Sequence, residues 1–335
     1  MVAQIDQTYI RTRPSKLWPR LLAYALFEGR PLTTRARWIN PFIRAEFALF
    51  RRLPTMQACP APVFIIGTGR SGTTILGIVL SMHRDVGFLN EPKLLWHTVI
   101  GSEDLIGSYG RGAARYRLAA ADATAEARLA VERIYGAYLR LGRSRRLVDK
   151  YPEMMFRVPF LRALFPDARF LFLSRDGWDT CSSVGQWSSQ HGTRVKGETH
   201  DWWGADQRKW QLLVAQIIPG HPDLAPHAAA LRDLSDHQAM AAVEWIVTMR
   251  EGLQQMHAHA DAVMHVPYEG LCQRPVETVR RIEAFLGLPA DPVFESYAAA
   301  TLAPARPRAR FALPAFLIEP FDATQAALRQ AQGAP

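Results

Sequence analysis

Residues 63–74 read Val-Phe-Ile-Ile-Gly-Thr-Gly-Arg-Ser-Gly-Thr-Thr, an apolar run that passes directly into a glycine-rich segment. The run at 63–66 predicts a buried parallel strand, and residues 75–82 predict a helix. Between them, the spacing Gly67-x4-Gly72 is that of a phosphate-binding loop. Glycines let successive N–H groups turn inward around phosphate oxygens, and the following helix adds its N-terminal donors and its dipole. The segment therefore predicts a strand, a phosphate-cradling loop and a helix.

The loop differs from that of nucleotide kinases and NTPases at one position. Those enzymes carry Lys at the place of Thr73, followed by a Ser or Thr that binds Mg²⁺. Here the fixed positive charge is Arg70, inside the loop. The nearest strand that could supply an Asp for Mg²⁺, at 170–176, has Arg175 at its end instead. These features disfavour a metal-dependent NTPase, and a phosphotransferase with a degenerate loop stays as the alternative.

The rest of the chain alternates short apolar runs with helical segments. Further strands are expected at 86–89, 146–148, 169–173 and 262–266. The clearest further helices are expected at 155–165, 178–186, 203–217, 236–258 and 275–286. Such alternation predicts an α/β fold, with a parallel sheet of about five strands and helices on both faces. We therefore expect a three-layer, P-loop NTPase-like architecture.

Four stretches of the chain resemble the sulfotransferases that use 3′-phosphoadenosine 5′-phosphosulfate (PAPS). Residues 63–76 resemble the loop that binds the 5′-phosphosulfate group. In the second stretch a strand ends at Arg175 and Ser183 follows eight residues later. These two side chains can converge on one phosphate, the 3′-phosphate that distinguishes PAPS from ATP. The other two stretches are 148–168 and 266–287, so the likeness covers roughly residues 62–185 and 262–290.

The resemblance implies in-line transfer of a sulfuryl group from PAPS to a hydroxyl or amine, without a metal and with release of 3′,5′-ADP. Positioning and positive charge should dominate such a reaction, and Arg70 and Lys150 are the candidate cations. The basic residues Arg306, Arg308 and Arg310 are further candidates near the 3′-phosphate. The residues expected to bind the donor are Gly69, Arg70, Ser71, Gly72, Thr73, Thr74, Arg175, Ser183 and Tyr268.

A general base must accept the proton of the acceptor. Glu91 is the first candidate, because it directly follows the strand at 86–90, where a loop opens over the edge of the sheet. It resembles the catalytic Glu of the tyrosylprotein branch and some carbohydrate branches of the family. Other branches use His, so four histidines stay as alternatives: His83, His97, His191 and His200.

The acceptor is expected to lie against residues 186–215. This region holds Trp187, Trp202, Trp203 and Trp210 among the polar residues His191, Arg194, Lys196 and His200. Aromatic rings beside polar groups suit sugars or aryl rings, but the same residues would also suit an ordinary core. We expect a small-molecule, glycan or lipid acceptor and no nucleic acid. A catalytically inactive nucleotide-binding homologue is a third reading, which the joint presence of the candidate catalytic and phosphate-binding residues disfavours.

Positive charge is concentrated near the N-terminus. The 335-residue chain has a formal net charge of +9, and residues 1–60 hold ten Lys and Arg against three acidic residues, with aromatics between them. Such a segment can lie on a membrane surface, or pack on the domain with its arginines in water. We therefore divide the chain into a basic aromatic arm, 1–60, and a sulfotransferase-like domain, 61–335. Peripheral membrane contact through residues 1–55 is the open alternative.

The cysteines and the apolar runs indicate where in the cell the protein is expected to lie. The three cysteines, Cys59, Cys181 and Cys272, are odd in number and far apart, which fits neither a disulfide framework nor a zinc site. No apolar run has the form of a signal peptide or the length of a transmembrane helix. The expected location is cytoplasmic, with peripheral contact at the inner face of a membrane as the alternative.

Overall fold

Five parallel strands form the central sheet of the protein, in the order β2-β3-β1-β4-β8. Their bounds are β1 Val63–Gly67, β2 Val86–Asn90, β3 Arg146–Lys150, β4 Arg169–Ser174 and β8 Val263–Pro267. The structure is a computed structural model that describes residues 3–195, 197–304 and 307–333. All five strands begin and end within two residues of the predicted positions, and the predicted α/β class is confirmed.

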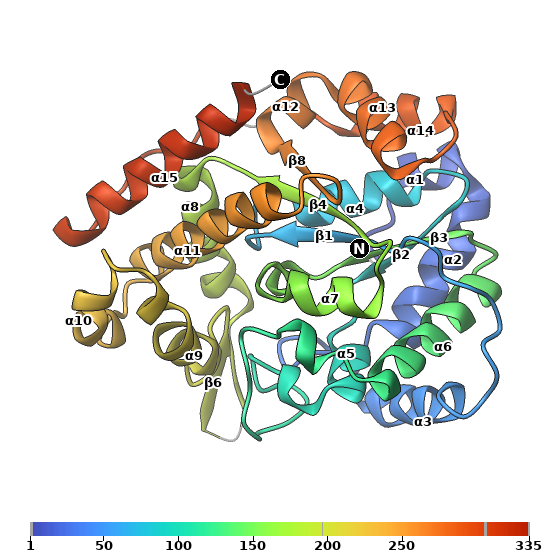
Figure 1. The fold of residues 1–335 in the computed structure, drawn as a ribbon, viewed down its shortest axis with the longest axis horizontal. Coiled ribbons are helices and arrows are strands. Elements are labelled where there is room, and N and C mark those ends of the chain that lie inside the picture. Colours follow the sequence, from blue (N-terminus) through green and yellow to red (C-terminus); the bar gives the residue numbers. More distant parts are fainter. Residues whose placement is uncertain (1–2, 196, 305–306, 334–335) are drawn as a thin grey trace.

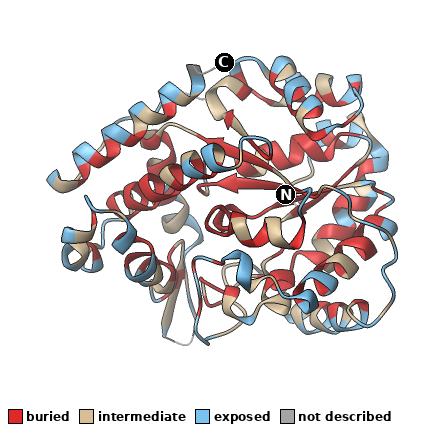
Figure 2. Ribbon diagram, in the orientation of Figure 1, coloured by how far each residue is buried: buried red, intermediate tan, exposed pale blue. Residues whose placement is uncertain are grey.

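Side-chain alternation along the strands builds a separate core on each face of the sheet. In β1, Val63 and Ile65 belong to one buried cluster, whereas Phe64 and Ile66 belong to the other. Successive residues of a strand point to opposite faces, so a strand buried on both sides must be apolar throughout. Figure 2 shows the strands as buried along their length. This is why residues 63–66 form a continuous apolar run.

Helices cover both faces of the sheet, as Figure 1 shows. The cluster of Val63 and Ile65 is closed by α1 Gln7–Thr12, α4 Thr73–Ser81, α12 Tyr268–Gln273, α13 Pro275–Leu286 and α14 Pro292–Thr301. The larger cluster of Phe64 and Ile66 is closed by α2 Leu17–Leu22, α3 Asn40–Phe50, α5 Lys93–Val99, α6 Ala125–Leu141, α7 Val158–Leu164, α8 Gly177–His191, α9 Arg208–Gln216, α10 Ala228–Arg232, α11 His237–Ala258 and α15 Ala315–Gly333.

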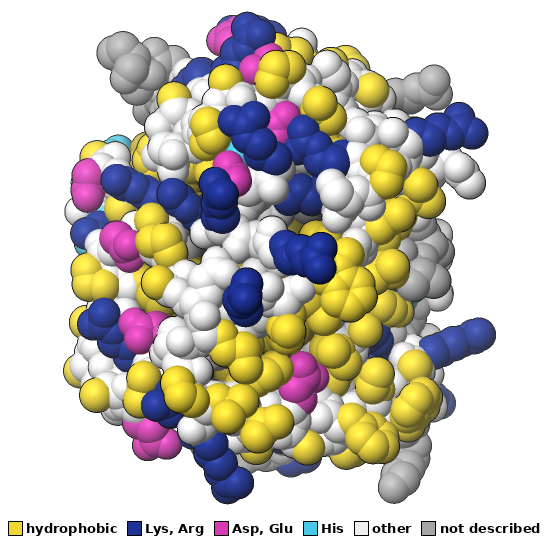
Figure 3. All heavy atoms as spheres, turned by 90° about the vertical axis from the view of Figure 1, so that its right-hand side faces the viewer, with side chains coloured by type: hydrophobic (Ala, Val, Ile, Leu, Met, Phe, Trp, Pro, Cys, Tyr) yellow, Lys and Arg dark blue, Asp and Glu magenta, His cyan; other side chains and the backbone are white. Residues whose placement is uncertain are grey.

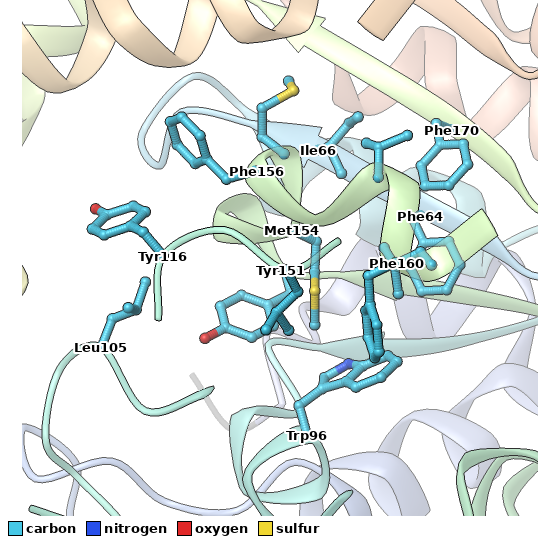
Figure 4. Packing of buried hydrophobic residues seen from close by; sticks show 14 of the residues in the cluster. Phe64, Ile66, Trp96, Leu105, Tyr116, Tyr151, Met154, Phe156, Phe160 and Phe170 are labelled. Atoms are coloured by element: carbon cyan, nitrogen blue, oxygen red, sulfur yellow. The ribbon is translucent and has the colours of Figure 1, made fainter. Parts of the chain in front are cut away.

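Aromatic rings fill the larger cluster beneath the sheet. Phe64 and Phe170, on neighbouring strands, stack with their ring centroids 5.5 Å apart, and Trp96 meets Phe160 edge-on at 6.2 Å. Figure 4 shows these rings together with Phe156 of the 3₁₀ segment Pro152–Arg157. The same segment follows β3 directly, so this packing also fixes the residues at the end of that strand.

The N-terminal segment packs closely against the α/β domain. Arg13 forms an ion pair with Asp291 at 2.6 Å, and Lys16 donates hydrogen bonds to backbone carbonyls on either side of the start of β2. Arg20 is 1% exposed and binds the Glu28 carboxylate, at 2.9 Å for one of its two contacts. The reading in which the segment packs on the domain with its arginines in water therefore fails for Arg20, and Lys16 is buried as well.

Two local predictions differ from the structure. The helix expected at 203–217 begins only at Arg208, because residues before it form the hairpin β6 Glu198–Asp201 and β7 Gly204–Ala205. Together with β5 Thr193–Val195 these strands form a small antiparallel sheet that was not predicted. Positive φ angles at Gly204, Asp206 and Gln207 exclude a helix there. The helix expected at 155–165 is instead the 3₁₀ segment Pro152–Arg157 followed by α7.

Among the described residues, no helix combines the length and apolar character needed to span a bilayer.

The buried Arg20–Glu28 pair predicts a large stability effect. In Glu28→Gln the Arg20 guanidinium stays buried without its counter-charge, and we expect the free energy of unfolding to fall by about 3 kcal/mol. Equilibrium unfolding in urea measures this. The matched control is Glu126→Gln, which breaks the 3.1 Å pair with Arg51 at a carboxylate that is 83% exposed. It should change stability by less than about 0.5 kcal/mol, and equal losses in both variants would contradict the prediction.

Candidate functional site

A left-handed turn connects β1 to α4 and forms the predicted glycine loop. Gly67 has φ +150°, Gly72 has φ +101°, and α4 begins at Thr73. The Ser71 N–H and hydroxyl both donate to the Thr68 carbonyl, at 3.3 and 2.5 Å, so the turn is closed from within. The first N–H groups of α4 have no intrahelical acceptor and carry the positive end of its dipole. The turn thus has the features of an anion cradle.

Two aromatic rings pack against the glycines of the loop. A Cβ atom on Gly69 would lie 2.4 Å from Cη2 of Trp202, and one on Gly72 would lie 2.4 Å from Cδ2 of Tyr268. Any larger residue at either position would have to displace a ring. The loop therefore needs glycine at these positions for close approach, besides the conformational need at Gly72.

Basic side chains converge beside the loop. Arg70, itself at φ +68°, donates from Nε to the Ser183 hydroxyl at 3.1 Å, and Arg175 donates to the Arg70 carbonyl at 3.3 Å. Burial and the neighbouring guanidinium groups of Arg175 and Arg308 lower the pKa of Arg70. Within the described residues, the buried Nε of Arg175 has no hydrogen-bond partner. Arg175 and Ser183, which were predicted to act together, thus both contact Arg70 of the loop. With Arg308 nearby, these side chains carry more positive than negative charge.

Glu91 and Lys150 meet at the ends of neighbouring strands. Asn90 of β2 lies opposite Lys150 of β3, so Glu91 follows immediately beyond the pair. The Glu91 carboxylate forms an ion pair with Nζ of Lys150, and the Glu91 N–H donates to the Lys150 carbonyl at 2.7 Å. Glu91 also has φ +52°, which is unfavourable for a residue with a side chain. Backbone strain of this kind concentrates at functional sites.

A chain of alternating charges continues from Glu91 along the site. Lys93 lies 3.4 Å from Glu91 and 3.3 Å from Glu153. Lys209 lies 3.5 Å from Glu153 and 2.5 Å from Glu244. The Trp202 indole donates to the other oxygen of Glu244 at 2.9 Å, which links this network to the ring that packs on Gly69.

The lysines keep the carboxylates of this network ionised. Burial alone would raise the pKa of Glu91, but Lys150 and Lys93 outweigh it and lower the pKa to about 2. Burial is likewise outweighed at Glu153, where Lys93 and Lys209 lower the pKa. At neutral pH both groups therefore carry negative charge, and Glu91 is a weak base for as long as both lysines contact it.

A cavity of about 650 Å³ joins these groups. Of the predicted site residues, nine line it: Gly69, Arg70, Gly72, Thr73, Thr74, Glu91, Lys150, Arg175 and Ser183. Ser71 and Tyr268 do not. The Ser71 hydroxyl is turned to Thr68, and Tyr268 reaches the site through Arg175, whose guanidinium lies 4.6 Å from the centre of its ring.

Much of the cavity wall was not predicted. The four further charged residues of the network, Lys93, Glu153, Lys209 and Glu244, line the cavity, and so do residues 28–34 of the N-terminal segment and Ile106, Ser108 and Tyr109. Lys93 and Glu153 could have been suspected, because each follows a strand end within three residues. Lys209 and Glu244 lie on helices far away in sequence, where no local signal marks them.

Some of the residues expected to bind the acceptor line the cavity, and others lie in the hydrophobic core. Trp187 and Trp202 line the cavity, with their ring centroids 5.4 Å apart, whereas Trp203 and Trp210 are fully buried core residues. Arg194 is exposed outside the cavity. Arg308 joins the cavity wall, and Arg310 instead lies over the Trp178 ring. Lys196 and Arg306 lie outside the described residues.

Among the four candidate histidines, His200 is the one that lines the cavity. It is 2% exposed, and its Nε2 lies 3.3 Å from Glu198. His83 is fully buried against the Pro289 carbonyl, and His191 stacks on Trp187. His97 stacks on Tyr109 at 6.1 Å, behind the cavity wall.

Part of the chain matches known proteins. Residues 62–225 match the model of the sulfotransferase family. Nodulation protein NoeE of Sinorhizobium fredii (strain NBRC 101917 / NGR234) is 27% identical over 249 residues, which cover 70% of this chain and 52% of that protein. The chain thus spans about half the length of this curated relative.

Among solved structures, a sulfotransferase domain from the curacin biosynthetic pathway is 16% identical with a TM-score of 0.47, covering 82% of this chain and 99% of that one. Sulfotransferase STF9 from Mycobacterium avium is 14% identical with a TM-score of 0.45, covering 98% and 92%.

The charge network predicts a directional change in the ionisation of Glu91. Lys93→Met removes one of the two cations that contact this carboxylate, so we expect its pKa to rise by roughly one unit. Carboxyl ¹³C NMR titration of the protein labelled at glutamate measures it, with Glu91→Gln to assign the signal. Lys209→Met is the matched control, because Lys209 pairs with Glu153 and Glu244. A rise of equal size in both variants, or none in Lys93→Met, would count against the geometry.

Proposed function

Because the chain belongs to the sulfotransferase family over residues 62–225, we propose that it transfers a sulfuryl group from PAPS to a hydroxyl or amine of an acceptor. The observation that carries this proposal is the meeting of Arg70, Arg175 and Ser183 beside a glycine loop with Thr73 in place of the P-loop lysine. This arrangement offers cations for two separate anionic groups, and PAPS carries a 5′-phosphosulfate and a 3′-phosphate.

The residues around the cavity fit such a donor. The glycine loop and the first N–H groups of α4 would cradle the 5′-phosphate, and the absence of Cβ atoms at Gly69 and Gly72 lets the Trp202 and Tyr268 rings pack against the loop. Arg175 and Ser183 would hold the 3′-phosphate, and the unpartnered Nε of Arg175 is a donor available for it. Arg308 adds positive charge to the same group. When bound, PAPS supplies the sulfuryl group and leaves as 3′,5′-ADP.

Glu91 and Lys150 are the proposed catalytic pair. The acceptor oxygen or nitrogen forms a bond to sulfur while the bond from sulfur to the 5′-phosphate oxygen breaks, and Glu91 takes the acceptor proton. Arg70 and Lys150 stabilise the charge that develops on the transferred and leaving oxygens. As Lys150 turns toward that charge, Glu91 loses one of its cations and becomes a stronger base.

A binding titration tests the donor assignment. By isothermal calorimetry, 3′,5′-ADP should bind independently of Mg²⁺ and far more tightly than 5′-AMP or ATP. Arg175→Met should weaken 3′,5′-ADP binding by about 10- to 100-fold, because it removes a charge-assisted hydrogen bond, and should leave 5′-AMP binding nearly unchanged. Equal affinity for ATP, or a requirement for Mg²⁺, would instead favour a phosphotransferase.

If Glu91 is the general base, its substitution should affect turnover but not donor binding. Glu91→Gln should keep the affinity for 3′,5′-ADP and lower the rate of transfer from labelled PAPS by roughly 10²- to 10⁴-fold. Mass spectrometry of a cell extract incubated with the protein and labelled PAPS provides the acceptor and the assay. His200→Gln is the control at the candidate histidine that lines the same cavity. If its rate falls while that of Glu91→Gln does not, the base is His200.

A further inference from the structure

Helix α3 has apolar side chains on two different faces. Ile43, Phe47 and Phe50 are buried and pack into the larger core cluster. On the solvent side, Phe42 is 67% exposed and Leu49 is 55% exposed. Trp38 in the turn before the helix is 70% exposed and meets Phe42 edge-on, with ring centroids 6.3 Å apart. A helix at the surface of a globular protein would ordinarily carry polar residues on this second face.

Arginines without partners surround this face. The side chains of Arg35, Arg37 and Arg52 form no hydrogen bond or ion pair within the described part of the chain. Between residues 35 and 52 the acidic side chain is Glu46, and burial raises its pKa to about 7, which weakens its negative charge near neutrality. We define the α3 face as Trp38, Phe42, Leu49 and these three arginines. Figure 3 shows hydrophobic side chains gathered low on the side of the molecule where α3 and α6 lie, with Lys and Arg side chains among them.

We propose that the α3 face docks on an anionic phospholipid surface. Aromatic rings at the level of the headgroups and guanidinium groups on the lipid phosphates are the two components of interfacial binding. The exposed rings alone would also suit a protein partner. The free arginines favour the lipid, because they complement a surface that carries negative charge throughout.

A second copy of the chain fits this face poorly. A two-fold interface would set the α3 face against itself, so the three arginines of one copy would lie near the same arginines of the other. Because the α3 face contains no acidic side chain to pair with them, the like charges would oppose association. The charge of the face therefore distinguishes a lipid surface from self-association.

The α3 face is coupled directly to the wall of the cavity. The Asn40 side chain pairs with the backbone of Arg30, accepting from its N–H at 2.8 Å and donating to its carbonyl at 2.8 Å. Arg44 donates to the Tyr109 carbonyl at 3.1 Å. Arg30 and Tyr109 both line the cavity. Docking would therefore bring this wall to the membrane, where it could receive a membrane-borne acceptor. That consequence rests on the proposed function, whereas docking itself does not.

Vesicle co-sedimentation of the full chain tests the proposal. The protein should bind phosphatidylcholine vesicles that contain phosphatidylglycerol, bind pure phosphatidylcholine weakly, and lose binding as salt is raised. The triple variant Arg35→Gln/Arg37→Gln/Arg52→Gln should lower the partition coefficient about 100-fold, since each arginine near an anionic surface contributes about five-fold. Trp38→Ala/Phe42→Ala should lower it about ten-fold through lost apolar burial.

The control variants lie on α15, on the opposite side of the molecule in Figure 1. Ile318 is 50% exposed and Arg329 is exposed, so Ile318→Ala/Arg329→Gln removes similar side chains there and should bind vesicles as the unmodified protein does. All variants should keep their affinity for 3′,5′-ADP, which separates this test from that of the proposed function. Vesicle binding unchanged in both α3 variants would overturn the proposal. So would a concentration-dependent dimer that Trp38→Ala/Phe42→Ala converts to monomer in light scattering.

Discussion

The site depends on the hydrogen bonding of β1 to a parallel strand on each side. Ile65 lies opposite Lys150 of β3, and Gly67 lies opposite Leu173 of β4. This register places the end of β1, and so the glycine loop, between the residues that follow its two neighbours. Gly67 is needed at this point because a Cβ atom would lie 2.4 Å from the Leu173 carbonyl oxygen. Lys150 at the end of β3 and Arg175 just beyond β4 therefore flank the loop because of the strand order. Ligand sites in open α/β sheets generally lie at this edge of the sheet.

The features predicted from the sequence are those that depend on a single strand and on the residues at its end. The apolar runs located all five strands, and the residues just beyond four of them, such as Glu91 and Arg175, were identified as site candidates. The same local logic could not find Lys209 or Glu244, which enter the site from helices through contacts with Glu153 and Trp202. It also missed the helix Ala125–Leu141, although Thr124 caps it and its apolar residues recur at helical spacing.

The charge network explains how several ionised groups can share one cavity. Glu91 and Glu153 each lie between two lysines, and Glu244 lies between Lys209 and the Trp202 indole, so the cost of removing these carboxylates from water is offset by close partners. Such a network also restrains its members, since moving one side chain leaves another unpaired. Arg70 differs, because burial and neighbouring cations both disfavour its charge. An anionic ligand is the natural complement of this group, whereas the lysines and glutamates of the network already neutralise one another.

The N-terminal segment shows why composition alone could not assign its role. Seven of its ten basic residues illustrate three physical groups that look alike in sequence. Lys16 and Arg20 are buried and hold the segment against β2 and Glu28. Arg13 and Arg44 bind particular groups on neighbouring elements. Arg35, Arg37 and Arg52 have no partner within the described residues. This last group lies on the turns that flank α3, so part of the surplus charge that first suggested a membrane is found beside one short helix. Since that helix also contacts the cavity wall through Asn40 and Arg44, the residues that would meet a membrane pack directly against residues that line the cavity.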